Sequence, residues 1–424
     1  MAKKGNTRKQ PRELTKRQIS KWQQQQRRQR ITFITGVTII AVALILILVG
    51  WFLTQFQPLH ETVIQVNDTR FDMKYYIDTL KFYGSTQSAE YVSYIAEDAI
   101  DDIEERELVR QAALELGMSV SDDEIKEKLE GSDLPDSNIS SDVISYSILV
   151  NKLLGEHFDS EVPVTAEQAH IMAMLLESES QALEVRDRLG NGESFAELAG
   201  ELSLESFTKN SEGDLGWHPE SILKELFYTE VPVDYAFNGE VGKLSEPLYD
   251  EEVSKSVGYW LIKVTEREEG TDSAHVYAIL LGSEDEAAGI KARLEAGEDF
   301  ATVAKENSLW YAAETNEGDL GMVSRGSTTT VLDEYVFDNG IELNTLSGPI
   351  RDDTTTTEGG HWLIKVFGRE NRQIEEDDRD VLKSRAFQEW VNSLWNDPEN
   401  LINDRALSSE KIAWAVAQAQ RDLK

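Results

Sequence analysis

QAHIMAMLL at residues 168–176 and SAHVYAILL at residues 273–281 decide how this chain folds, because they are two copies of one strand-like segment. They lie 105 residues apart, and the segments that follow them repeat in the same order. Three further matched pairs are NGESFAELAGELS and AGEDFATVAKENS (191–203 and 296–308), SEGDLGW and NEGDLGM (211–217 and 316–322), and GYWLIKV and GHWLIKV (258–264 and 360–366). Four matches in one order indicate a duplicated domain, since solenoid repeats are only about 20–50 residues long.

Each copy predicts the same small α+β domain. Its first segment is a short apolar run typical of a buried strand, and its last, WLIKV, reads as a second strand. Between them lie two predicted helices and a GDLG turn, whose glycines permit tight backbone geometry. The predicted helices are 177–190 and 194–202 in the first copy, and 284–296 and 299–306 in the second. This order predicts helices packed on an antiparallel sheet.

The N-terminal segment predicts a membrane anchor. Residues 1–30 contain eleven Lys and Arg and one acid, and the 23 residues from Ile31 to Leu53 contain no charge. A bilayer core of about 30 Å needs about 20 helical residues, so this run can span it. A cleaved signal peptide is the main alternative, but the run exceeds the about 7–15 apolar residues of such a signal. The positive-inside rule places the basic tail in the cytoplasm and the later domains outside.

Composition limits the chemistry. The 424 residues carry a net charge of −36, and those after Leu53 hold 31 bases against 77 acids, which argues against nucleic acid as the main partner. The absence of cysteine excludes disulfides, thiolate metal sites and a lipid-modified N-terminal Cys. The six histidines have no metal-ligand spacing and no G-x-S-x-G motif occurs, so we expect no metal, no cofactor and no serine triad.

The motifs AH-[IV]-x-A, G-E-x-F-A-x-[LV]-A-x-x-x-S, G-D-L-G and G-x-W-L-I-K-V, in this order, resemble the parvulin (PpiC, rotamase) family of peptidyl-prolyl cis-trans isomerases. The resemblance covers both repeats. It implies domains that isomerise X–Pro bonds, a reaction that needs no metal or cofactor. The reaction needs a pocket that binds the twisted amide better than the planar one.

The flanking segments resemble foldases of the SurA, PrsA and PpiD type. VIQVNDTRF (63–71) is similar to their opening strand, and residues 98–116 with the following GMSVSDDEIKEKL are similar to their helical chaperone domain. Ser121 and Glu124 form a predicted capping box at the start of a helix in that domain. Apolar residues at i, i+4 spacing near the C-terminus predict a helix that returns to pack on the chaperone domain.

The predicted fold class is therefore α+β, with a transmembrane helix, a helical SurA-like chaperone domain completed by the C-terminal helix, and two tandem parvulin-like domains. The predicted boundaries are 1–30 for the basic tail, 31–53 for the transmembrane helix, 60–162 for the chaperone domain, 165–268 and 272–370 for the parvulin-like domains, and 375–424 for the C-terminal helical segment.

The resemblance also implies a site in each repeat, with an apolar slot for the proline ring, two facing histidines and a Cys or Asp. In repeat one the implied catalytic residues are His170, Glu205 and Trp260, and the implied substrate-binding residues are Leu223, Phe227 and Phe237. The equivalents in repeat two are His275, Leu332, Phe337 and Trp362. Trp replaces the second histidine in both repeats, and repeat two also has Thr328 in the slot. We therefore expect any activity to reside in repeat one.

Each of these residues also has a purely structural interpretation. The two histidines could tie strands together, the two tryptophans could be core aromatics, and Leu223 with Phe227 could be the buried face of a helix. Asp214 and Asp319 of GDLG could simply form turns. These interpretations leave two main hypotheses open: an isomerase and chaperone for unfolded exported polypeptides, or a membrane-anchored holdase whose repeats only bind peptide. A scaffold of an envelope complex is a third, weaker possibility, and the sequence does not determine the oligomeric state.

Overall fold

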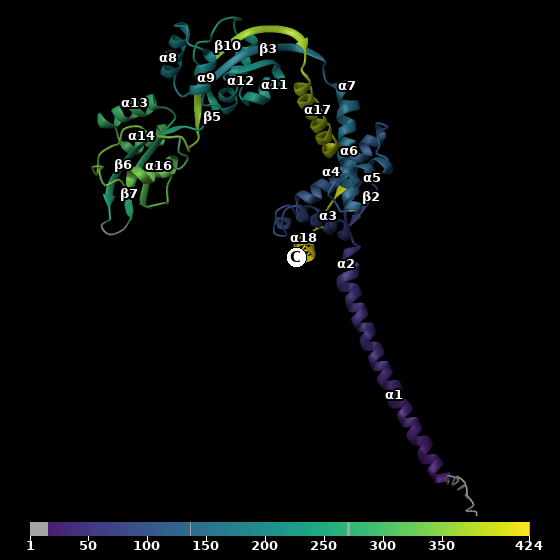
Figure 1. The fold of residues 1–424 in the computed structure, drawn as a ribbon. Helices are drawn as coiled ribbons and strands as arrows, with labels where there is room; N and C mark the ends of the chain where they lie inside the picture. Colours follow the sequence, from purple (N-terminus) through teal and green to yellow (C-terminus); the bar gives the residue numbers. More distant parts are fainter. Residues whose placement is uncertain (1–15, 136, 269–271, 424) are drawn as a thin grey trace, which may run out of the picture. The chain divides into compact units, whose positions relative to one another are not determined.

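The computed structural model describes residues 16–135, 137–268 and 272–423 (Figure 1). The chain divides into two compact units. The first combines Met1–His157 with Phe387–Lys424, and the second is Phe158–Ala386.

The first unit is mostly helical, with one small three-stranded sheet of order β11-β1-β2. Its elements are α1 (Lys16–Trp51), a π-helical turn (Phe52–Phe56), α2 (Gln57–Leu59), β1 (Thr62–Val66), β2 (Thr69–Asp72), α3 (Met73–Thr86), a 3-10 turn (Tyr91–Ser93), α4 (Asp98–Glu115), α5 (Asp122–Glu130), α6 (Asn138–Lys152), a second π-helical turn (Leu153–His157), the second half of α17 (Glu376–Asn396), β11 (Ile402–Asn403) and α18 (Ser409–Asp422).

Helix α1 contains all but the last two residues of the predicted anchor, 31–53. Within the described residues, Thr32–Trp51 is the one stretch of helix long and apolar enough to cross a membrane, with a mean hydropathy of 2.8 and no part of it buried. At its end the rings of Phe52 and Phe56 stack with centroids 5.3 Å apart, and Phe56 stacks on His60 at 4.2 Å. Length and apolar composition fit a membrane span or a signal sequence.

The C-terminal segment completes the core of the first unit. β11 pairs with β1 through Val66 and Ile402, and the side chains of Ala415 and Ala419 on α18 are fully buried against α3 and β1. The turn between β1 and β2 places Asn67 at a φ of +52°, which Asn tolerates better than most residues. The predicted capping box at the start of α5 is confirmed, because Ser121 and Glu124 cap each other.

Glu104 on α4 is an unusual member of this core. Its side chain is buried, and its Oε1 has no hydrogen-bond partner among the described residues. Burial, reinforced by Asp404 and Asp101, raises its pKa to about 7. Because the folded pKa exceeds the ordinary value, the first unit loses stability as pH rises from about 4.5 through 7.

The second unit contains two four-stranded antiparallel sheets with helices on their faces. Its elements are α7 (Phe158–Glu161), β3 (Thr165–Leu176), α8 (Glu179–Gly190), α9 (Phe195–Leu202), α10 (Ser206–Asn210), β4 (Asp214–Pro219), α11 (Glu220–Phe227), α12 (Glu230–Asn238), β5 (Leu248–Lys255), β6 (Gly258–Arg267), β7 (Ser273–Leu281), α13 (Glu284–Glu295), α14 (Phe300–Asn307), α15 (Ala313–Asn316), β8 (Asp319–Ser324), α16 (Thr330–Val336), β9 (Ile350–Asp352), β10 (Thr357–Gln373) and the first half of α17 (Glu376–Asn396).

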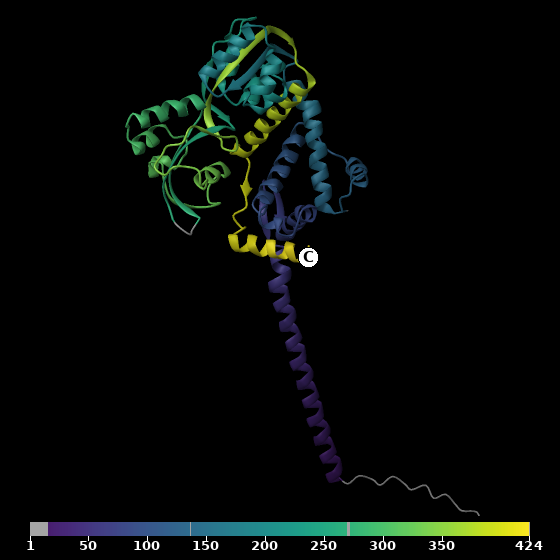
Figure 2. The ribbon, with the colours of Figure 1, turned by 60° about the vertical axis from the view of Figure 1, so that its left-hand side comes forward.

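The two repeats exchange their last strands. The first sheet has the order β4-β3-β10-β5 and the second has the order β8-β7-β6-β9. The strand GHWLIKV of repeat two therefore lies inside the sheet of repeat one, and GYWLIKV of repeat one lies inside the sheet of repeat two. In both ribbon views the yellow-green β10 runs beside the blue-teal β3 (Figures 1 and 2). Each sheet therefore needs one strand from the other repeat. The predicted segments 165–268 and 272–370 instead assumed that each domain is one continuous stretch of sequence.

The link between β5 and β6 explains the exchange. Only Ser256 and Val257 separate these strands, and a two-residue hairpin would require positive φ values, for which Asn and Gly are suited. No residue of the segment 248–267 has a positive φ. The chain instead continues through a bend at Ser256 into the other sheet, where Val257 is fully buried. Thr357 Oγ1 donates to the Val257 carbonyl at 2.5 Å where the chain crosses back.

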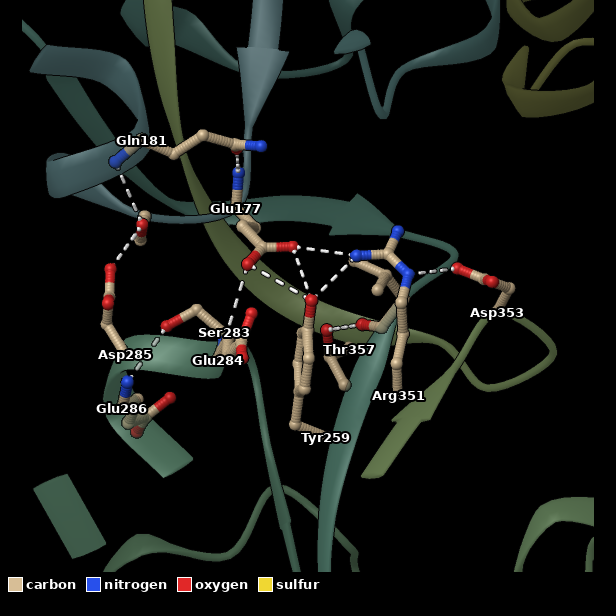
Figure 3. Close-up of polar contacts among 12 residues, drawn as sticks. Glu177, Gln181, Tyr259, Ser283, Glu284, Asp285, Glu286, Arg351, Asp353 and Thr357 are labelled. Atoms are coloured by element: carbon tan, nitrogen blue, oxygen red, sulfur yellow. Dashed lines mark hydrogen bonds and ion pairs between the residues drawn. The ribbon is translucent and has the colours of Figure 1, made fainter. Parts of the chain in front are cut away.

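A polar network joins the two domains beside this crossing (Figure 3). The carboxylate of Glu177, at the end of β3, accepts hydrogen bonds from Tyr259 at 3.0 Å and from Arg351 Nη1 at 3.1 Å. It also accepts from the backbone amide of Glu284 at the start of α13. Nearby, Ser178 of the first domain donates to Asp285 of the second at 2.8 Å. The largest influence on the pKa of Tyr259 is burial, and Glu177 adds to it, so that pKa rises to about 12.

Helix α17 is divided between the two units: Glu376–Ala386 belongs to the second, and the part from Phe387 onward belongs to the first, where Leu394 packs on the core. The first turn of α17 contacts β4 of the first sheet, where His218 Nδ1 lies 2.8 Å from Asp378. Farther along the same helix, Arg385 Nε donates to Glu225 of α11 at 2.7 Å. Burial lowers the pKa of His218, but the hydrogen bond and charge of Asp378 outweigh it, so the net pKa is raised. The helix that packs on α3 is α18.

The exchange predicts which engineered disulfides form. Met172 faces Lys365 of β10 in the first sheet, and Tyr277 faces Lys263 of β6 in the second. Facing residues of antiparallel strands have Cα atoms about 4.5–5.5 Å apart, within disulfide range. We therefore expect the double variant Met172→Cys/Lys365→Cys to oxidise readily, as measured by mobility on non-reducing gels. The chain has no native cysteine to interfere.

The matched control is Met172→Cys/Lys263→Cys, the pair that contiguous repeats would bring together. It should stay reduced under the same oxidant. Oxidation of this control, with the first pair unreactive, would show that each repeat closes its own sheet.

Glu104→Gln should stabilise the first unit at pH 8 and have little effect at pH 5. The substitution removes a buried ionised carboxylate that lacks a full set of partners. The shift in pKa corresponds to at most about 3 kcal/mol, so we expect about 1–3 kcal/mol from thermal or urea unfolding of the full chain in detergent. Glu115→Gln, at an exposed position of the same helix, is the control. An equal gain at both pH values would contradict this account of Glu104.

Candidate functional site

The predicted proline slot of the first domain is part of a closed core. Leu223 and Phe227 on α11 are buried, with 0% and 5% of their surface exposed. The ring of Phe227 meets the indole of Trp362 edge to face, with centroids 5.1 Å apart. Trp362 is itself fully buried. An indole from the exchanged strand therefore packs against the position where an apolar slot was expected.

Each tryptophan is fixed by a buried aspartate. Trp362 Nε1 donates to Asp250 Oδ2 at 2.9 Å, and Thr229 donates to the same oxygen at 2.7 Å. In the second domain Trp260 Nε1 donates to Asp352 at 3.0 Å. A buried indole N–H needs such an acceptor, so these bonds set the ring orientations.

The expected pairing of Trp260 with His170 is wrong. Trp260 lies in β6, inside the second sheet, where it packs with Leu332 and meets Trp310 at 6.4 Å. Trp362 takes the corresponding place in the first sheet. The physical reason is the strand exchange, which sends each Trp to the other domain.

His170 lies on the opposite face of the first sheet from the slot residues. Its neighbours Ala169 and Ile171 belong to the same buried core as Leu223 and Phe227. Side chains alternate along a strand, so His170 points to the other face. There its ring contacts Trp217 at 5.6 Å and Phe367 at 5.2 Å. The structure therefore does not bring His170 into the Leu223–Phe227 cluster.

A His–Asp pair recurs in both domains. His170 Nε2 lies 2.8 Å from Asp214, and His275 Nε2 lies 2.7 Å from Asp319. Each aspartate also accepts from a glycine amide two residues on, such as Gly216. Burial raises the pKa of Asp214, but the hydrogen bonds from His170 and the Gly216 amide outweigh it and hold the net pKa below its usual value. These bonds join β3 to β4 and β7 to β8. The DLG residues of each GDLG motif, which was expected to form a turn, begin strands β4 and β8.

The remaining expected residues have mainly structural contacts. Glu205 caps α10 by accepting from the Thr208 amide at 2.7 Å. Phe237 packs, half-buried, on the first-sheet core, and Leu332 is buried in the second. Phe337 lies under the guanidinium of Arg325, 4.6 Å from the ring centroid. Among the described residues, no group of three His, Asp or Glu side chains could hold a metal ion.

Sequence reasoning missed the two aspartates and the aromatic side chains beside His170. Asp250 and Asp352 lie 102 residues apart, the separation of Trp260 and Trp362, and that shared offset was a usable signal. Trp217 and Phe367 had no such signal, because their counterparts in the other repeat are Met322 and Thr265.

Comparison with protein families identifies the repeats. One model for a PPIC-type peptidyl-prolyl isomerase domain matches residues 170–266, and a second model of the same description matches residues 259–370. These are two PPIC-type, or parvulin, domains. Together the matches include both exchanged strands.

Curated relatives are foldases and chaperones. The foldase protein PrsA of Caldanaerobacter subterraneus subsp. tengcongensis is 28% identical over 191 residues, which cover 42% of this chain and 59% of the relative. The chaperone SurA of Methylobacillus flagellatus is 30% identical over 205 residues, which cover 43% of each chain. The solved structure of PrsA from Bacillus cereus covers 85% of this chain and 99% of its own, at 12% identity and a TM-score of 0.28. The chain thus spans about half the length of the curated relatives it matches.

Proposed function

We propose that this protein is a membrane-anchored foldase that binds unfolded exported polypeptides outside the cytoplasm and isomerises their X–Pro bonds. The observation that carries the proposal is the pair of parvulin domains behind an N-terminal apolar helix. The basic residues before that helix favour a cytoplasmic N-terminus. The acidic domains that follow suit a soluble module held near an anionic membrane.

We assign isomerisation to the first domain. The uncatalysed reaction takes tens to hundreds of seconds, and an apolar site that prefers the twisted amide is sufficient to accelerate it. Leu223 and Phe227 supply apolar walls there, whereas the second domain has the polar Thr328 at the corresponding slot position. Access for a proline ring requires the indole of Trp362 to move, so we expect a low rate.

A second candidate function is a holdase that binds clients without isomerising them. The burial of Leu223, Phe227 and Trp362 favours it, because a filled slot leaves no room for a proline ring. Both candidates share the same client class, and a single assay separates them.

Trp362→His should raise the proline-isomerisation rate of the full chain at least about threefold over wild type, as measured by protease-coupled cleavage of a proline tetrapeptide. The smaller ring opens space beside Phe227 and leaves a donor for Asp250. Trp260→His should not change the rate, because strand exchange places Trp260 in the second domain. Phe227→Leu should lower the rate by removing the ring wall.

Tyr311→Ala, at an 87% exposed position, is the neutral control. Circular dichroism confirms that each variant is folded. If neither wild type nor Trp362→His exceeds the uncatalysed rate while both suppress aggregation of an unfolded client, the isomerase assignment fails and the holdase stands.

A further inference from the structure

We infer that the face of the first sheet opposite the slot is a binding platform for client segments in which a proline or another apolar residue lies beside an acidic residue. This inference rests on the proposed foldase function and specifies its client. The platform consists of His170, Trp217, Lys365, Phe367 and Arg372. None of these residues belongs to the closed core around Leu223.

The platform is an uncovered part of a sheet. Helices α8 and α9 cover the end of this face near Met174 and Leu176. Farther along the same face, His170 and Trp217 are only half-buried and Phe367 is 46% exposed. His170 contacts both other rings. Three adjoining aromatic rings on an open sheet form a flat apolar surface of the kind that accepts proline-rich, extended peptides.

The rings are held in place by the backbone and by cations. A Cβ at Gly368 would lie 2.6 Å from Trp217 Cη2, so the indole lies directly over a glycine. The guanidinium of Arg372 lies 4.6 Å from the Trp217 ring centroid, and Lys365 Nζ lies 5.0 Å from that of Phe367. The surface is therefore preorganised, which reduces the entropy lost on binding.

Beside the platform lies a cleft of about 610 Å³ that shares Lys365 and Phe367 with it. Phe195, Leu189 and Leu244 supply apolar walls. The cleft therefore offers a recess for a client side chain that follows the residue stacked on the platform.

Charge complementarity selects the client. Of the cations that line the cleft, Arg186 pairs with Glu246 at 2.5 Å, and Lys243 pairs with Glu240 at 3.5 Å. Lys365 makes no ion pair among the described residues. Asp187 and Glu193 also line the cleft, and Glu193 is engaged by Arg188 at 2.8 Å. Lys365 can therefore form an ion pair with a client carboxylate that lies beside the client's proline. The excess of acidic residues elsewhere on the chain repels such a carboxylate.

The platform exists only in the first domain, and only because of the strand exchange. His170 and Trp217 come from repeat one, whereas Lys365, Phe367 and Arg372 come from repeat two on β10. Without exchange, β6 would place Thr265 at the position of Phe367. The second domain has Met322 and Thr265 in the equivalent places, so it lacks the aromatic surface.

The test measures binding of fluorescein-labelled peptides to the full chain in detergent by fluorescence anisotropy. The probe peptide carries Phe-Pro-Glu between Gly-Ser spacers. Two comparison peptides carry Phe-Pro-Lys or Phe-Ala-Glu in its place. We expect Phe-Pro-Glu to bind most tightly. Phe367→Thr and Trp217→Met, which introduce the residues found at the equivalent places of the second domain, should each weaken binding of this probe about tenfold. Lys365→Gln should abolish the preference for Glu over Lys while retaining proline preference.

Met322→Ala and Tyr311→Ala are the matched controls in the second domain and should bind as wild type does. Equal binding of the probe to wild type, Phe367→Thr and Trp217→Met would overturn the platform. Tighter binding of labelled single-stranded oligonucleotide than of any peptide, lost in Phe367→Thr, would overturn the choice of a peptide. Aggregation suppression by wild type, measured alongside, keeps the two proposals distinct. If only the platform proposal is wrong, wild type still suppresses aggregation of an unfolded client. If the foldase proposal is wrong, wild type does not suppress it.

Discussion

The rest of the second unit depends on one short backbone link. Ser256 and Val257 are poorly suited to reverse the chain in a two-residue hairpin, because neither favours the positive φ that such a turn needs. The strand after them therefore enters the neighbouring sheet. The next repeat must return its own last strand to fill the gap, and Thr357 crosses beside Val257 as it does so.

This constraint makes the two parvulin domains interdependent. β10 and β6 are interior strands of the sheets they join, so neither sheet can close if the other repeat is displaced. Lys255 lies buried at the crossing and donates to the carbonyls of Glu358 and Gly359, with its pKa lowered by burial. The Glu177 network beside it fixes the domains further. We therefore expect the two domains to unfold as one cooperative unit.

The exchange also makes the domains unequal. The strands GYWLIKV and GHWLIKV are nearly identical, but the residues that follow them differ. Strand exchange places those following residues in the sheet of the other repeat. The first domain thereby receives Phe367 and Arg372, and the second receives Thr265. As a result, the first domain alone has an exposed aromatic face. Beside it lies Lys365, which makes no ion pair among the described residues. Duplication followed by exchange has thus produced a surface that neither repeat encodes.

The sequence predicted the individual elements better than their partners. The offset of 105 residues located both repeats, and apolar periodicity placed their helices within a few residues of the observed bounds. Strand pairing is non-local, and β6 and β10 are so alike that composition could not assign them to sheets. The expected pairing of His170 with Trp260 failed for the same reason, because the two residues lie in different sheets. Leu223 and Phe227 were placed correctly on one helix face, but their burial depends on Trp362, which arrives from the other repeat.

The contact between Phe227 and Trp362 tests the exchange most directly. In full-length protein labelled with 5-fluorotryptophan, the ¹⁹F resonances of Trp260 and Trp362 can be assigned by Trp→Phe substitution and then compared with those of Phe227→Leu. The ring of Phe227 lies 5.1 Å from that of Trp362, so its removal should shift the Trp362 resonance and leave that of Trp260 in place. A shift of the Trp260 resonance instead would show that each repeat keeps its own last strand, and the strand exchange would be wrong.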